Sequence, residues 1–130
     1  MRFGGMIWVV TNNRRTRHTL VPLIAAKGYT TLDLDCGDEV PRRMQFQIPS
    51  LVIIDCGMPD SFKTLAEVRA QPNSHVVPVV MFSEDAPGHR ERALLGGANA
   101  FVEKGTLDWA ELLAEVTRFA GPPPAHQTDR

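Results

Sequence analysis

Three side chains that could take part in phosphoryl chemistry follow short apolar segments of this chain of 130 residues. Asp55 ends the run LVIID, Ser83 follows VVPVVMF, and Lys104 follows AFVE. A carboxylate oxygen can attack phosphorus, while a hydroxyl and an ammonium group can hold the phosphoryl oxygens as negative charge develops. These residue types therefore indicate a site for phosphoryl transfer if the fold brings the three together.

Five apolar runs are predicted strands, because each is rich in β-branched or aromatic residues and is bounded by polar or glycine-containing turns. They are MIWVV (6–10), TLDL (31–34), LVIID (51–55), VVPVVMF (76–82) and AFVE (100–103). Three of them lack polar alternation, as a parallel sheet covered by helices on both faces requires. In such an α/β fold functional groups collect beyond the carboxyl ends of the strands, where all three side chains would lie.

Segments with helical spacing of apolar residues lie between these runs. Helices are predicted after possible N-caps at Asn13, Ser61 and Thr106. The helix around Pro41 requires this proline to sit in the first turn, and residues 86–97 form a sparse helix that ends at two glycines. The pattern is a βα unit repeated five times.

Composition limits the classes of protein to consider. With 43% hydrophobic and 22% charged residues, the chain fits one domain over residues 1–120, followed by a disordered tail or linker stub over residues 121–130. The net charge of −1 comes from interspersed signs, so we expect neither nucleic acid nor an anionic membrane as a partner. No run approaches the length of a membrane span, and we expect a cytoplasmic protein.

The cysteines and histidines do not indicate a metal site. Cys36 and Cys56 lack metal-ligand spacing, so we expect two small buried side chains with free thiols. The histidines lack such spacing as well and are expected at the solvated surface: His18, His75, His89 and His126.

The same motifs, in this order, resemble the receiver domains of two-component response regulators, over residues 6–120. The sequence DCGMP that begins at Asp55 is similar to the phospho-accepting aspartate and D-x-x-M-P turn of that family. Ser83 stands at its Thr or Ser position, Lys104 at its lysine, and Phe101 at its aromatic switch residue. The resemblance implies a flavodoxin-like (βα)5 sheet of strand order 2-1-3-4-5 and a binding switch controlled by phosphorylation.

The sequence departs from the family at the metal site. Thr11 and Asn12 occupy the positions at which the family has an acidic pair that holds a magnesium ion. Asp55, the Asn12 amide oxygen and the Gly57 carbonyl would then supply one negative charge in place of three, and Mg²⁺ favours charged oxygen ligands. We therefore expect Mg²⁺ binding to be weak or absent.

Two further departures lie beside the site. Gly105 follows the lysine where the family usually has a cis proline, so this peptide bond should be trans. The residues after Pro59 read DSFKTL and lack the family's Asp-Gly, which implies a reshaped loop.

Each site residue also has a structural interpretation. Asp55 is either the phosphoacceptor or a buried carboxylate paired with Lys104. Ser83 either contacts a phosphoryl group or caps the next helix or bonds a loop amide. Phe101 is either a switch or an aromatic residue of the core or of an interface.

Two functions therefore stay open. The domain is predicted to be a pseudo-receiver, meaning a non-enzymatic interaction module that binds protein partners through residues 87–119, possible partners being a histidine kinase or an output domain. The alternative is a phosphoreceiver that accepts a phosphoryl group on Asp55 from a histidine kinase or a histidine phosphotransfer protein. The absence of the acidic pair favours the first.

Overall fold

A five-stranded parallel sheet forms the centre of the protein, in a computed structural model that describes residues 2–84, 87–104 and 109–123, without the side chains of residues 2–5. The sheet has the order β2-β1-β3-β4-β5. The predicted fold class and strand order are therefore confirmed. The strands are β1 (Arg2–Val10), β2 (Thr30–Leu34), β3 (Ile48–Asp55), β4 (Val79–Ser83) and β5 (Ala100–Glu103).

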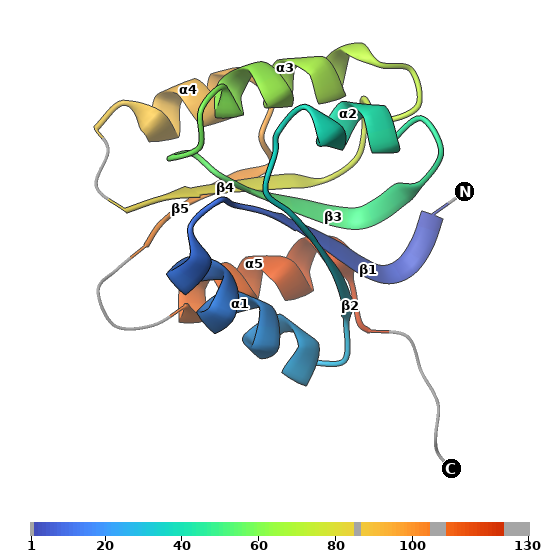
Figure 1. Cartoon of the computed structure of the whole chain (residues 1–130), viewed down its shortest axis with the longest axis vertical. Helices are drawn as coiled ribbons and strands as arrows, with labels where there is room; N and C mark the ends of the chain where they lie inside the picture. Colours follow the sequence, from blue (N-terminus) through green and yellow to red (C-terminus); the bar gives the residue numbers. More distant parts are fainter. Residues whose placement is uncertain (1, 85–86, 105–108, 124–130) are drawn as a thin grey trace.

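Helices cover both faces of the sheet (Figure 1). On one face lie α1 (Arg14–Ala26) and α5 (Ala110–Ala120), and on the other lie α2 (Glu39–Arg43), α3 (Ser61–Ala70) and α4 (His89–Leu95). The first pair of helices buries Leu20, Ile24, Leu112 and Val116. The other three bury, among others, Val40, Leu65, Val68 and Ala93. None of the described helices is long and apolar enough to cross a membrane.

The burial of the central strand β3 on both faces explains why its sequence lacks polar alternation. Leu51 and Ile53 pack into the core on the side of α1 and α5, whereas Val52 and Ile54 pack into the core on the opposite side. All four are at most 1% exposed. Successive side chains of a strand point to opposite faces, so a strand covered on both faces must be apolar throughout. This burial ends at Asp55, at the carboxyl edge of the sheet.

Several predicted helix features are confirmed. The Asn13 side chain caps α1 by accepting a hydrogen bond from the backbone N–H of Thr16 at 2.9 Å. Pro41 lies in the first turn of α2, where its missing N–H costs no helical hydrogen bond. The predicted stop after α4 is also present, with Gly97 in the left-handed region at φ 106°.

Other boundaries differ from the predictions. β4 begins at Val79, and Val76, which was expected in this strand, is 76% exposed in the preceding turn. α5 begins at Ala110, so Trp109 precedes the helix. The Trp109 ring packs edge-on against the Phe82 ring, with 5.4 Å between the ring centres. The predicted cap at Thr106 lies outside the described residues.

The expected tail begins at a residue that is tied to the domain. The hydroxyl of Tyr29, the residue just before β2, donates a hydrogen bond to the Gly121 carbonyl. Residues 124–130 of this tail lie outside the described residues.

A half-buried arginine of α3 joins the two turns that precede β4 and β5. The Arg69 guanidinium donates hydrogen bonds to the carbonyls of Gly97 at 2.9 Å, Val77 at 2.7 Å and His75 at 3.2 Å, and to Asn99 Oδ1 at 2.9 Å. Burial lowers the pKa of this guanidinium from its ordinary value. One side chain thus satisfies four acceptors that belong to two segments far apart in the sequence.

We predict that Arg69→Met lowers the free energy of unfolding by about 3 kcal/mol, because it leaves partly buried carbonyls without a donor. Urea denaturation would measure the loss. Arg118→Met is the matched control, since the Arg118 side chain is 68% exposed and forms an i,i+3 pair with Glu115, which is expected to contribute about 0.5 kcal/mol or less. Equal losses in the two variants would contradict this role of Arg69.

Candidate functional site

The carboxylate of Asp55 is held by two hydrogen-bond donors at the end of β3. The Thr11 hydroxyl donates to Asp55 Oδ2 at 2.8 Å, and the Gly57 backbone N–H donates to Oδ1 at 2.8 Å. The hydroxyl of Thr11, a fully buried residue, in turn accepts from the Asn13 backbone N–H at 3.1 Å. Each donor engages a different oxygen, so the orientation of the carboxylate is fixed without a cation.

The predicted ion pair between Asp55 and Lys104 is wrong. Lys104 Nζ lies 3.0 Å from Glu84 Oε2 and 4.9 Å from the centre of the Trp109 ring. Glu84 is favoured because the Lys104 backbone N–H bonds to the Ser83 carbonyl at 2.8 Å, which places the lysine next to the residue that follows β4. The Lys104 side chain is 21% exposed and the Glu84 side chain 64% exposed, so this is a pair near the surface.

The hydroxyl of Ser83 is engaged by a histidine that the sequence analysis assigned to the solvated surface. Ser83 is 5% exposed, and its Oγ lies 3.0 Å from Nδ1 of His89, the first residue of α4. His89 is half-buried, and its ring packs edge-on against the ring of Phe62 of α3, with 5.4 Å between the ring centres. The alternative that Ser83 caps the next helix is wrong, because Gly88 is the N-cap of α4 and makes no side-chain cap bond.

A cavity of about 390 Å³ at the carboxyl edge of the sheet brings most of these residues together. Asp55, Ser83 and Asn12 line it, whereas Lys104 is not among its lining residues. The other lining residues are Asn13, Thr16, Gly57, Phe82, Glu84 and His89. The sequence did not indicate His89 as a site residue, because it does not follow a strand directly, although the start of the helix after a strand lies at the same edge of the sheet.

Phe101 lies in the core beside α4. It is 6% exposed and packs with the buried residues on the face covered by α2, α3 and α4. The Arg90 guanidinium lies 5.1 Å from the centre of its ring. This placement matches the interpretation of Phe101 as a core aromatic residue.

The residues at the site do not fit a magnesium ion. The Thr11 hydroxyl is directed at Asp55 Oδ2, and Glu84, the other acidic residue that lines the cavity, is paired with Lys104. In the described part of the chain, no group of three or more His, Cys, Asp or Glu side chains could hold a metal. Gly105, where a trans peptide bond was expected, lies outside the described residues. A single carboxylate and neutral oxygens form a poor set of ligands for Mg²⁺.

Both thiols are free, as predicted. Cys56 is buried next to Asp55, whereas Cys36 is exposed, so the expectation of a buried side chain is wrong for Cys36. Burial raises the pKa of Cys56 to about 12, with a further contribution from the Asp55 charge that Arg92 partly opposes. Cys56 is therefore a protonated, inert thiol at neutral pH.

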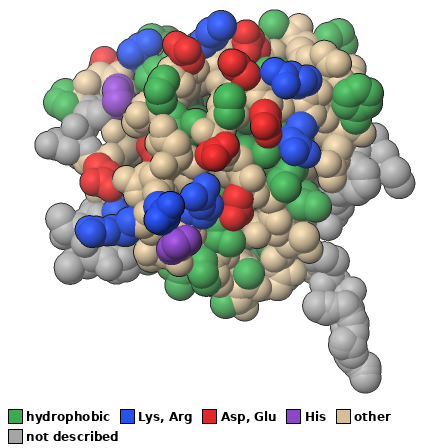
Figure 2. All heavy atoms as spheres, viewed as in Figure 1, with side chains coloured by type: hydrophobic (Ala, Val, Ile, Leu, Met, Phe, Trp, Pro, Cys, Tyr) green, Lys and Arg blue, Asp and Glu red, His purple; other side chains and the backbone are tan. Residues whose placement is uncertain are grey.

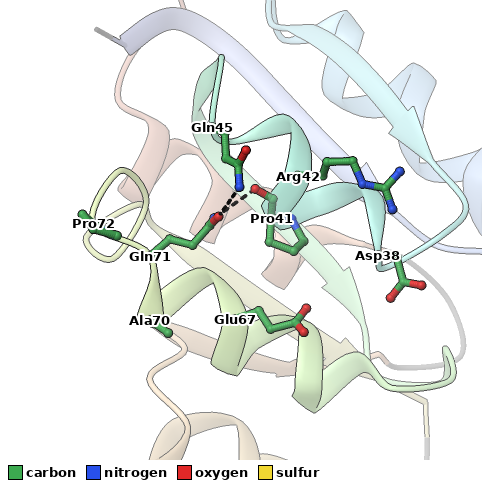
Figure 3. A pocket seen from close by; sticks show the side chains of 8 residues that line it. All are labelled: Asp38, Pro41, Arg42, Gln45, Glu67, Ala70, Gln71 and Pro72. Atoms are coloured by element: carbon green, nitrogen blue, oxygen red, sulfur yellow. Dashed lines mark hydrogen bonds between the residues drawn. The ribbon is translucent and has the colours of Figure 1, made fainter.

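A second hollow, of about 600 Å³, lies between α2 and α3 (Figure 3). The Gln45 amide donates to Gln71 Oε1 at 3.2 Å, and Gln71 Nε2 donates to the Pro41 carbonyl at 2.9 Å. The remaining lining residues are Asp38, Arg42, Glu67, Ala70 and Pro72. Both signs of charge are present and the amides bond to one another, so the hollow has no cluster of groups suited to chemistry.

A protein-family model matches most of this chain. The sequence model described as "Response regulator receiver domain" matches residues 7–117. A gliding motility regulatory protein of Myxococcus xanthus is 29% identical over 113 residues, which are 85% of this chain and 14% of that protein. The chain thus spans about one seventh of the length of this curated relative.

Solved structures share the fold. The receiver domain of a sensor histidine kinase from Pseudomonas aeruginosa, with a magnesium ion in its active-site cleft, has a TM-score of 0.81 and 27% identity. The match covers 92% of this chain and 99% of that one. The chemotaxis response regulator CheY4 of Vibrio cholerae has a TM-score of 0.78 and 20% identity, with 90% and 99% covered, and supports the fold alone.

We predict that iodoacetamide labels the native protein once at about pH 8, because a thiol with a pKa of about 12 is then thiolate in about one molecule in ten thousand. Intact mass should show one adduct in the native protein and two after denaturation. Cys36→Ser should remove the native adduct, whereas Cys56→Ser should leave it. Equal labelling rates of both thiols in the native protein would contradict the assignment.

Proposed function

Because the chain belongs to the family of response regulator receiver domains, we propose that it is a pseudo-receiver of two-component signalling. It keeps the receiver fold and the outline of the site, and it binds protein partners without magnesium-dependent phosphorylation of Asp55. In this proposal the domain is a cytoplasmic interaction module and not an enzyme.

The hydrogen bond from Thr11 to Asp55 carries this proposal. A receiver that accepts a phosphoryl group needs a cation beside the aspartate, because the dianionic group and the carboxylate repel each other. Here a neutral hydroxyl stands beside Asp55 and offers no charge to attract a divalent ion. Thr11 therefore stabilises the unmodified Asp55 carboxylate and does not help to bring a phosphoryl donor close to it.

The two other groups of the site are also engaged elsewhere. Lys104 Nζ lies 3.0 Å from Glu84 Oε2, and Ser83 Oγ lies 3.0 Å from His89 Nδ1. Accepting a phosphoryl group on Asp55 would require both contacts to break or rearrange, and each rearrangement adds to the cost of the reaction.

Residues 87–119 are the proposed partner surface. Within the described part of this range, α4 exposes Leu94 and Leu95, which are 46% and 88% exposed. Phe101 is already buried beside α4. In this proposal the partner surface therefore forms without phosphorylation of Asp55. Figure 2 shows acidic and basic side chains interspersed over the face in view, which favours a protein partner over nucleic acid. A histidine kinase or an output domain fits this role.

A phosphoreceiver is the second candidate function. The observation that favours it is that Asp55 and Ser83 line one cavity. The related receiver domain from Pseudomonas aeruginosa coordinates a magnesium ion in its own cleft.

We predict that the protein gains no mass when it is incubated with Mg²⁺ and a small phosphodonor such as acetyl phosphate, because Asp55 lacks a metal-bound partner. Intact mass spectrometry without acid treatment would detect an added phosphoryl group. Asp55→Asn is the control for labelling elsewhere on the chain. Stoichiometric labelling of the parent that this variant loses would replace the pseudo-receiver with the phosphoreceiver.

We further predict that Thr11→Asp combined with Asn12→Asp creates a magnesium site, because it places three carboxylates at the ends of β1 and β3. Without metal the variant should unfold at a lower temperature than the parent, since crowded like charges disfavour the folded state. At a Mg²⁺ concentration about 100 times the dissociation constant, binding should stabilise it by about 2.7 kcal/mol.

The melting temperature with and without Mg²⁺ measures this gain. Thr19→Asp combined with Asn73→Asp adds the same charge at exposed positions away from the cavity and should show no such response. An equal response of parent and site variant would mean that other oxygens already complete a metal site.

A further inference from the structure

We propose that the hollow between α2 and α3 is a self-association surface, on which a second copy of this chain docks about a two-fold axis that runs along the hollow. In this arrangement α2 of each copy faces α3 of the other. Among the described residues, the hollow shares no lining residue with the cavity at Asp55, and it lies outside residues 87–119. The inference therefore goes beyond the proposed function and does not depend on it.

Hydrogen bonds between the two helices keep this surface ordered. Gln71 Nε2 donates to the Pro41 carbonyl at 2.9 Å, and Gln45 Nε2 donates to Gln71 Oε1 at 3.2 Å (Figure 3). The Asn73 side chain donates to the Gln45 carbonyl at 3.3 Å, which joins the turns that follow the two helices. A surface that is already ordered loses little conformational entropy when a partner binds.

An exposed phenylalanine stands beside the hollow. Phe46 is 85% exposed and directly follows Gln45, which lines the hollow. No other phenylalanine, tyrosine or tryptophan with a described side chain is exposed. Pro72 lines the hollow two residues after α3, and Val76, which is 76% exposed, lies in the same turn. Apolar side chains that protrude from an ordered surface are typical anchors of protein interfaces.

The two sides of the hollow carry charges in opposite order. On the α2 side Asp38 is followed four residues later by Arg42, and on the α3 side Lys63 is followed four residues later by Glu67. Asp38, Arg42 and Glu67 line the hollow, and Lys63 Nζ lies 4.0 Å from Glu67 Oε2. Both helices follow parallel strands and therefore run in the same direction, from the carboxyl edge of the sheet to the amino edge.

This order of charges fits a second copy. Among the described residues no ion pair joins α2 to α3, so Arg42 and Glu67 stay apart across the hollow. When α2 of one copy lies against α3 of the other, Arg42 meets Glu67 of the second copy, and the two-fold axis repeats this contact. Asp38 and Lys63 are matched in the same way. A strongly acidic or strongly basic partner would instead place like charges opposite half of these side chains.

The apolar turns meet under the same symmetry. Phe46 follows α2, and the turn with Pro72 and Val76 follows α3, so Phe46 of each copy faces that turn of the other. Removing these side chains from water favours association. The charged pairs then fix the register of the two copies, because exposed ion pairs contribute more to specificity than to affinity.

Sedimentation velocity of the full chain from about 10 µM to about 1 mM tests the proposal, a range that covers the weak association of a small interface. We expect a reversible equilibrium of monomer and dimer without larger species, because a two-fold interface closes at two copies. Phe46→Ser should weaken the dimer at least about tenfold. Leu23→Ser, at an exposed apolar residue of α1 on the opposite face of the sheet, is the matched control and should leave the dimer unchanged.

Exchanging charges identifies the pairing. Arg42→Glu and Glu67→Arg should each weaken self-association, because each change places like charges opposite each other at both contacts. An equimolar mixture of the two variants should restore the dimer, since every like pair is then replaced by an opposite pair. Both chains must be folded to associate, so this restoration excludes loss of the fold as the cause of the weakening.

Three results would overturn the proposal. The first is a chain that stays monomeric at about 1 mM. The second is a dimer that Phe46→Ser leaves intact and Leu95→Ser abolishes, since Leu95 of α4 would place the contact within residues 87–119. The third is a mixture of the charge variants that does not associate. None of these experiments contains Mg²⁺ or a phosphodonor or alters Asp55, so their outcomes are separate from the test for phosphorylation.

Discussion

A carboxylate at the end of a strand that is buried on both faces must find hydrogen-bond donors, and this requirement determines the arrangement of the whole site. β3 is apolar from Leu51 to Ile54 and delivers Asp55 to the carboxyl edge of the sheet. Thr11 and Gly57 supply the donors. With these two donors Asp55 does not need the Lys104 ammonium as a partner. The hydrogen bonds of Asp55 therefore depend on Thr11, the residue that directly follows the neighbouring strand β1.

The packing of the sheet keeps this arrangement rigid. β1 lies beside β3 with Val10 opposite Ile54, so the residues that follow each strand, Thr11 and Asp55, emerge side by side. β4 pairs with the other edge of β3 with Phe82 opposite Asp55, which places Ser83 one residue beyond. At the opposite end of these strands Arg69 ties down the turns before β4 and β5. The strand ends have little freedom to move relative to one another.

The βα repeats could be predicted from the sequence because they depend on local pattern, whereas the strand order 2-1-3-4-5 came from the resemblance to receiver domains. The apolar residues of β3 and the caps and glycines of the helices predict the βα repeats, and the topology then brings Asp55 and Ser83 to one edge. The side-chain partners of Lys104 and Ser83 could not be predicted from the sequence. Lys104 bonds to Glu84 and Ser83 to His89 because of how the chain leaves β4, and no periodicity encodes that path. The helix predicted after Thr106 would include Trp109, because this buried aromatic residue fits the helical spacing, although it precedes α5 in the structure.

The charge at this edge determines how strongly the site attracts a divalent cation. Asp55 and Glu84 contribute two negative charges and Lys104, which is paired with Glu84, contributes one positive charge, which leaves −2 + 1 = −1 for these three groups. Two more carboxylates, at positions 11 and 12, would make this −3, an excess that a divalent cation offsets. With Thr11 and Asn12 in their place, the excess of these groups is a single charge, and the Thr11 hydroxyl and the Gly57 N–H already satisfy the Asp55 carboxylate. Replacing the acidic pair thus removes both the charge and the free carboxylate oxygens on which a divalent cation depends.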